Sequence, residues 1–145
     1  MLKSQMTDIV FKTSVAVSAA ALVSACSDTS QMGFNATIQD LGNERLELIA
    51  TVMNHSAEVK TLSNIDIDNG LHKKLDLHLM QGSIGEYIPI DNTISYPINK
   101  RLAPGQIYTF RLRGTKAALF ITGDIDFIIN GDNLSFRSFP VSCCH

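Results

Sequence analysis

Three cysteines are the residues with the most distinctive chemistry in this 145-residue chain, and they lie near its two ends. Cys26 follows a stretch of small residues, whereas Cys143 and Cys144 are adjacent and precede the final His145. A cysteine thiol can be acylated, can form a disulfide or can bind a soft metal ion. Which reaction applies depends on the compartment and on the elements that position each thiol.

The stretch before Cys26 has the composition of an export signal. Lys3 and Lys12 precede a ten-residue run of small and apolar side chains at 14–23. A charged start, a short apolar run and small residues before a cleavage point are typical of a secretory signal peptide. The run is too short to cross about 30 Å of hydrocarbon as a helix. We therefore expect residues 1–25 to be a signal peptide that is removed on export.

Val23-Ser24-Ala25-Cys26 resembles the lipobox of bacterial lipoproteins, an aliphatic residue and two small residues before a cysteine. The resemblance implies cleavage before Cys26 and acylation of its thiol with a diacylglycerol, so that chains such as palmitate anchor the protein. Each buried methylene adds about 0.8 kcal/mol to such an anchor. Ser27 rather than Asp follows the cysteine, which by the sorting pattern of enteric bacteria favours the periplasmic face of the outer membrane. Residues 26–33 would then be the lipidated cysteine and a short polar tether.

The remainder of the chain has the composition of one folded domain. Hydrophobic residues make up 45 % of the sequence and charged residues 18 %, which excludes a disordered chain. The net charge of −2 provides no clustered basic face, so we expect no nucleic-acid partner. We expect a single domain over residues 34–141, followed by a Cys-Cys-His tail at 142–145.

Alternating apolar residues between turn signals predict a series of short strands. We expect strands at 34–38, 45–53, 59–68, 75–80, 107–113, 124–129 and 134–139, whereas 82–96 and 115–121 are ambiguous. In the third of these, Val59, Thr61, Ser63, Ile65 and Ile67 are expected on one face. Asn69-Gly70 predicts a hairpin turn, and Pro104-Gly105 predicts a type II turn. About seven strands without a long helix favour an all-β, antiparallel immunoglobulin-like sandwich.

The order of turns and strands resembles the immunoglobulin-like modules of bacterial envelope lipoproteins. The resemblance rests on Asn54-His-Ser56, Leu102-Ala-Pro-Gly105 and Gly123-Asp124, and it covers most of residues 34–141. It implies a fold class and no particular function, because any sandwich can share such turn and register signals.

Leu77-His78-Leu79-Met80 resembles the histidine-bearing strand of periplasmic copper chaperones. Imidazole and thioether are ligands that suit Cu(I), so the resemblance implies a metal site at His78 and Met80. The chain departs from that family's pattern in two places. No Met follows Met80, and Tyr108 and Phe110 stand where the family has a His-x-Met pair. Copper handling is therefore the alternative function.

The Cys143-Cys144-His145 end could bind a soft metal ion or form a redox pair, or it could simply be exposed. Cα atoms of adjacent residues are about 3.8 Å apart, below the usual range for a disulfide, so a ring between these neighbours would be strained. The sequence therefore favours pairing with another chain, or the binding of both thiols to a partner.

No pattern in the chain predicts an enzyme or a cofactor. The sequence has no Gly-x-Ser-x-Gly elbow, no His-Glu-x-x-His and no glycine-rich phosphate loop. Carboxylates such as Asp66, Asp68, Asp76, Asp124 and Asp126 lack the spacing of a calcium loop and are expected on the wet faces of strands. Arg111 and Arg113, with Arg137, could form an anion or partner patch, but exposed, solvated charge is the default explanation.

The expected function is therefore non-catalytic. The sequence predicts an envelope protein, held to the membrane by lipid, that binds another envelope protein or supports an assembly. An edge strand near Pro89 to Pro97 would be the docking place, because an exposed sheet edge can accept a strand from a partner.

Overall fold

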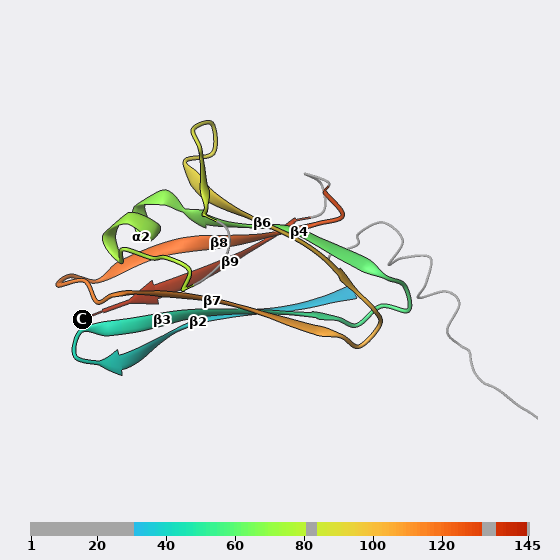
Figure 1. Ribbon diagram of the computed structural model, residues 1–145, viewed down its shortest axis with the longest axis horizontal. Coiled ribbons are helices and arrows are strands. Elements are labelled where there is room, and N and C mark those ends of the chain that lie inside the picture. The colour runs from blue at the N-terminus through green and yellow to red at the C-terminus, as the bar shows by residue number, and fades with distance from the viewer. Residues whose placement is uncertain (1–30, 81–83, 132–135, 145) are drawn as a thin grey trace, which may run out of the picture.

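Two antiparallel sheets form an all-β sandwich in the computed structural model, which describes residues 31–80, 84–131 and 136–144 (Figure 1). The three-stranded sheet has the order β2 (Met32–Gly42), β3 (Arg45–Asn54) and β7 (Ile107–Thr115). The five-stranded sheet has the order β5 (Glu86–Ile88), β6 (Thr93–Leu102), β4 (Lys60–Asp68), β8 (Ile121–Ile129) and β9 (Phe136–Cys143). The predicted signal peptide and Cys26 lie outside the described residues.

The facing sides of the two sheets form one apolar core, as alternation along the strands requires. Leu46, Leu48, Ala50 and Val52 of β3 are buried, as predicted. From the other sheet, Ile125 and Phe127 of β8 pack into the same cluster. Burial of one such large side chain stabilises the fold by about 1.5–3 kcal/mol. The predicted all-β fold is confirmed, with eight described strands where about seven were expected.

Residues with positive φ form the turns at two of the connections between strands. Asn43 and Glu44 join β2 to β3 with φ of 55° and 61°, the conformation that suits a tight hairpin. Between β6 and β7, the Gln106 amide donates to the Ala103 carbonyl at 2.9 Å, and Gly105 has a φ of 82°. This is the predicted type II turn, in which the third residue needs a positive φ.

The predicted hairpin at Asn69-Gly70 is wrong, because these residues begin helix α2 (Asn69–Lys74). The Asp68 carboxylate accepts a hydrogen bond from the Leu71 amide at 3.0 Å and caps the helix. Leu71 is fully buried and fixes the helix on the sandwich. The cap and this apolar contact override the turn preference of the Asn-Gly pair.

Residues 75–80 do not form the predicted strand. Their one ladder contact is an isolated bridge between His78 and Arg113. Leu75 and Leu77 are buried as expected, so the alternation reports burial correctly. Alternating apolar residues can thus be buried against β7 without forming a continuous ladder of backbone hydrogen bonds.

The expected inward face of β4 is wrong in its first half. The register shifts between Leu62 and Asn64, which marks a β-bulge. Before the bulge Lys60 and Leu62 are buried, and after it Ile65 and Ile67 are buried as predicted. The extra residue reverses which side chains face the core, and strict alternation cannot foresee this.

The two ambiguous segments adopt different structures. Residues 82–96 contribute the short edge strand β5 and the start of β6. Pro97 lies in β6 beyond the end of β5, where β6 itself forms the sheet edge and a missing amide is tolerated. In the segment 115–121, Thr115 ends β7 and Ile121 begins β8, and residues 116–120 between them form a loop.

Candidate functional site

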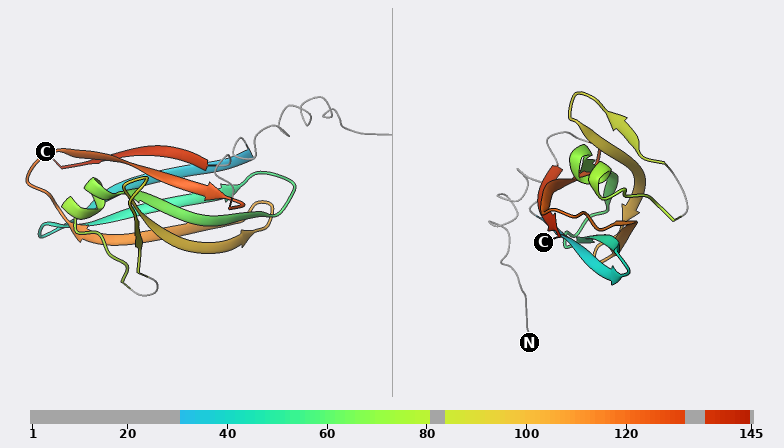
Figure 2. Two further views of the ribbon diagram at one scale, coloured as in Figure 1. Left: turned by 90° about the horizontal axis from the view of Figure 1, so that it is seen from above. Right: turned by 90° about the vertical axis from the view of Figure 1, so that its left-hand side faces the viewer.

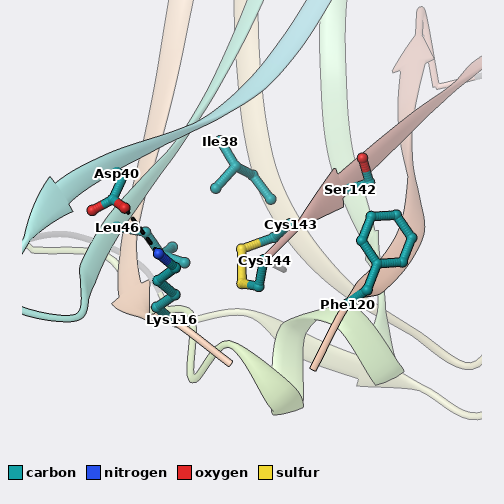
Figure 3. A pocket seen from close by; sticks show the side chains of 8 residues that line it. All are labelled: Ile38, Asp40, Leu46, Lys116, Phe120, Ser142, Cys143 and Cys144. Atoms are coloured by element: carbon teal, nitrogen blue, oxygen red, sulfur yellow. Dashed lines mark hydrogen bonds and ion pairs between the residues drawn. A yellow bond between two sulfur atoms is a disulfide. The ribbon is translucent and has the colours of Figure 1, made fainter. Parts of the chain in front are cut away.

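Cys143 and Cys144 are joined by a disulfide and line a pocket of about 280 Å³ at the end of the sandwich (Figure 3). Helix α2 and the C-terminus lie at this end, whereas β2 begins at the opposite end (Figures 1 and 2). The pocket is lined by Ile38, Asp40, Leu46, Lys116, Phe120, Ser142, Cys143 and Cys144.

Strand β9 carries the disulfide into the pocket, because it continues to Cys143 in register with β8. Cys143 pairs with Ile121 and is 9 % exposed, and Cys144 is 7 % exposed. The expectation of a solvent-exposed tail is therefore wrong for these two residues. Alternation along β9 turns Val141 and Cys143 inward, so the strand buries its last residue instead of releasing it.

The two cysteines are joined to each other, not to another chain as the sequence favoured. Their Cα atoms are 3.7 Å apart, as one peptide bond requires, and the ring closes at this separation. A disulfide stabilises a fold mainly by closing a long loop in the unfolded chain. A ring between neighbours closes almost no loop, so this disulfide contributes little as a staple.

An ion pair forms the polar side of the pocket. The Lys116 ammonium lies 3.1 Å from Oδ2 of Asp40, and Oδ1 of Asp40 accepts the Gly42 amide at 2.8 Å. The Gly42 amide and then Lys116 hold the pKa of the Asp40 carboxyl below its usual value. The Lys116 amide donates to the Glu44 carbonyl at 2.8 Å, which ties the 116–120 loop to the β2–β3 turn.

Apolar side chains form the rest of the pocket wall. Ile38 and Leu46 come from the three-stranded sheet, and Phe120 comes from the loop before β8. Phe120 is 57 % exposed and Leu119 is 79 % exposed, so the loop presents apolar surface beside the pocket. The sequence analysis singled out the two cysteines and missed these partners, which lie far apart along the chain.

The structure places both predicted copper ligands, His78 and Met80, at the surface. His78 is exposed, and its Nδ1 is hydrogen-bonded to the Asp76 carbonyl at 3.0 Å. Met80 is also exposed. Within residues 31–80, 84–131 and 136–144, no group of three or more His, Cys, Asp or Glu side chains could hold a metal ion.

The three arginines considered as a patch are separated. Arg111 and Arg113 both bind Glu47 on the outer face of the three-stranded sheet, at 3.0 and 3.1 Å. Arg137 belongs to β9 and lies over the Phe34 ring, 5.7 Å from its centroid. The hypothesis of one anion-binding patch is therefore wrong, because Glu47 neutralises part of the charge and the third arginine lies on the other sheet.

The acidic residues form a row across the outer face of the five-stranded sheet. Asp66 and Asp126 are cross-strand neighbours, and Asp66 accepts the Ser95 hydroxyl at 2.5 Å while Asp126 accepts that of Ser138. Burial raises the pKa of Asp66, and the Asp126 charge raises it further. Burial also raises the pKa of Asp126, with Asp124 adding to the effect.

The outer edge at β5 exposes several large apolar side chains. Ile84 and Ile90 are each 90 % exposed and flank β5, and Tyr87 within the strand is half-exposed. The hairpin between β5 and β6 projects away from the sandwich (yellow in Figures 1 and 2). This is the segment near Pro89 that the sequence predicts as a docking edge.

Comparison with known proteins leaves the chain without an assigned family. No protein-family model matches it, and no curated protein does either. In the described part of the chain, no helix has the length and apolar character needed to span a bilayer.

Proposed function

We propose that this chain is a lipid-anchored envelope protein whose sandwich domain binds another envelope protein and catalyses no reaction. The lipobox-like sequence ending at Cys26 supports the anchor, and the periplasmic face of the outer membrane is the proposed location. One observation carries the binding role, the exposed apolar edge at β5 described above.

The β5 edge has the features of a strand-addition site. β5 pairs with β6 on one side only, from Glu86 with Ser95 to Ile88 with Thr93. An edge strand presents unpaired amide and carbonyl groups that a partner strand can complete, and adjacent side chains give specificity. Exposed isoleucines at 84 and 90 would pack against apolar side chains of that partner, since exposed apolar patches mark interaction sites.

The position of the tether supports the same arrangement. β2 starts at Met32, within the last two residues of the expected tether, and it runs toward the end of the sandwich that carries α2 and the C-terminus (Figure 1). Eleven residues of strand span about 35 Å at roughly 3.3 Å per residue. An anchor at Cys26 would thus attach the domain through the start of β2. The end of the sandwich that carries α2 and the pocket would then lie far from the lipid.

Membrane fractionation of the full chain tests the anchor. The natural sequence is expected in the membrane fraction, and Cys26→Ala is expected to lose it. A Cys143→Ser/Cys144→Ser double variant is the matched control, because it removes two thiols and keeps Cys26. Retention of Cys26→Ala in membranes would contradict the anchor.

Site-specific crosslinking in intact cells tests the docking edge. A photoreactive phenylalanine analogue at Tyr87 is expected to yield one discrete crosslinked product that contains another envelope protein. The control places the same analogue at Thr109, an exposed residue on β7, the edge strand of the other sheet. Equal products from both positions, or none from Tyr87, would contradict docking at β5.

The alternative function, copper handling at His78 and Met80, gains no specific support from the site. It stays a prediction from the sequence, and Cu(I) titration of the natural chain against His78→Ala tests it. Binding no tighter than that of the variant would end the alternative.

A further inference from the structure

We propose that Cys143 and Cys144 form a reversible dithiol–disulfide site, and that its co-substrates are small thiols that enter the pocket beside Lys116. This inference is independent of the proposed docking function, because the disulfide lies in a pocket at the end of the sandwich and not at the exposed β5 edge.

The first support is that the disulfide contributes little to the stability of the fold. The free energy that a disulfide adds to a fold grows with the length of the loop it closes. The two cysteines are adjacent, so reduction frees almost no additional conformations in the unfolded chain. Leu46 and Val141 are buried in the same core cluster as the two cysteines, so apolar packing stabilises this region in addition to the bond. The pair can therefore open and close while the sandwich stays folded.

The second support is that the disulfide is reachable by a small molecule but shielded from a large one. Both cysteines are less than a tenth exposed, yet they line a pocket of about 280 Å³ (Figure 3). Thiol–disulfide exchange requires a thiolate to reach one sulfur of the bond. A pocket of this size admits a small thiol, and the low exposure of both cysteines limits direct contact with a folded protein.

The third support is the charge beside the sulfurs. Lys116 lines the same pocket and provides an ammonium group close to where thiolates must arrive and form. A neighbouring cation favours the thiolate form of a cysteine. Asp40 holds the Lys116 ammonium at 3.1 Å and offsets part of its charge, so the ion pair positions the cation and also weakens its effect on a thiolate.

The exchange balances as two displacement steps. In the first, a thiolate RS⁻ attacks one sulfur of the pair, the Cys143–Cys144 bond breaks, and the other cysteine leaves as a thiolate. In the second, another RS⁻ attacks the RS sulfur of the mixed disulfide, RSSR forms and the second cysteine leaves. Two small thiols are oxidised, the protein disulfide gains two electrons, and the two thiol protons end on the cysteines. The reverse steps with RSSR restore the disulfide.

Peptide mapping of the full chain after incubation with reduced glutathione tests the proposal. Trypsin releases 138–145, which carries both cysteines and is separate from Cys26. After acid quench and alkylation with N-ethylmaleimide in denaturant, this peptide is expected to carry no label before glutathione. It should carry two labels afterwards, and none again after oxidised glutathione is added. A peptide that carries two labels from the start, or that stays unlabelled at glutathione concentrations that reduce the urea-unfolded chain, would overturn the proposal.

A trapped intermediate tests the chemistry of the first step. With Cys143→Ser, oxidised glutathione is expected to leave one glutathione on Cys144, because no neighbouring thiol can resolve the mixed disulfide. An unmodified Cys144 in the folded variant, with full modification in urea, would overturn access through the pocket. Circular dichroism melting checks that the variant is folded.

The lysine is tested with a matched pair of variants. Lys116→Gln keeps most of the side-chain length and removes the charge, and it is expected to slow reduction by glutathione roughly fivefold. Lys100→Gln, at an exposed position on β6 far from the pocket, is expected to leave the rate unchanged. Equal rates for both variants would overturn the assignment of the Lys116 pocket as the route of attack.

Discussion

Asp66 on β4 and Asp126 on β8 lie directly opposite each other in the five-stranded sheet, so two carboxylates occupy one cross-strand pair. Each accepts a serine hydroxyl, from Ser95 and Ser138. Like charges placed opposite each other destabilise a sheet, and burial adds to the effect. The same relation makes this pair a place where a neutral side chain should improve the fold.

Asp126→Asn is expected to stabilise the protein by about 0.2–1 kcal/mol at neutral pH, because it removes one of two opposed charges and keeps an acceptor for Ser138. Burial raises the folded-state pKa of Asp126, so its favourable contribution is full below the unfolded pKa and is lost as pH rises through the folded value. The gain from the variant should therefore shrink as pH falls toward 4. Urea unfolding at several pH values measures this, with exposed Glu58→Gln as control. A larger gain at acid pH than at neutral pH would contradict it.

His72 and Tyr96 form a hydrogen bond of 2.6 Å between Nε2 and the hydroxyl, half-buried beside α2. Burial lowers the pKa of His72 below its usual value, and Asp76 opposes this. A depressed histidine pKa contributes stability that is present above the unfolded pKa of about 6.5 and is lost as pH falls through the folded value. His72→Gln should flatten the dependence of the unfolding free energy on pH between 7 and 5. The non-titrating control, exposed Asn35→Gln on β2, should leave that slope unchanged, and an equal change in both variants would refute the assignment.

Asn54 ties three chain segments together from a fully buried position. Its Nδ2 donates to the carbonyls of Leu102 and Glu58 at 2.8 and 2.7 Å, and its Oδ1 accepts the amide and hydroxyl of Ser56. Asn54→Ala removes all four of these hydrogen bonds from a buried site and should cost about 1–3 kcal/mol of the unfolding free energy. Chemical denaturation measures the loss. The control, exposed Asn35→Ala on β2, is expected within about 0.5 kcal/mol of the natural chain.

Gly114 allows the segment after α2 to approach β7 closely. A Cβ at this position would lie 2.4 Å from the Leu75 carbonyl oxygen and 2.9 Å from Cδ2 of Leu77. Since a backbone atom cannot move aside as a side chain can, Gly114→Ala should destabilise the fold by about 1–3 kcal/mol. Thr115→Ala at the exposed neighbouring position should change the melting temperature little. A tolerated Gly114→Ala would show that residues 75–77 do not pack against β7 in this way.

Local patterns predicted the strands that have one wet and one buried face. β3, β7 and β8 follow strict alternation, and the Pro104-Gly105 turn follows from its two residue types. The same reasoning failed at Asn69-Gly70, where the Asp68 cap begins a helix. Capping depends on one hydrogen bond and on burial of Leu71, and neither is visible in the turn residues themselves.

The sequence does not predict which residues come together to line the pocket. Cys143 and Cys144 are conspicuous because adjacent cysteines are chemically unusual, yet their burial depends on how far β9 extends. Asp40 and Lys116 are 76 residues apart in sequence, and nothing in the residues next to either one indicates that they form an ion pair. Long-range pairing of this kind is set by the stacking of two sheets, which no local spacing encodes.

Intact mass spectrometry of the protein purified from the membrane fraction tests the central claim most directly. The account predicts a mass that matches cleavage before Cys26 plus a diacylglycerol and acyl chains, with the Cys143–Cys144 pair two hydrogens lighter than the dithiol. A mass of the uncleaved chain, or of a cleaved chain without lipid, would contradict the lipid-anchored envelope protein.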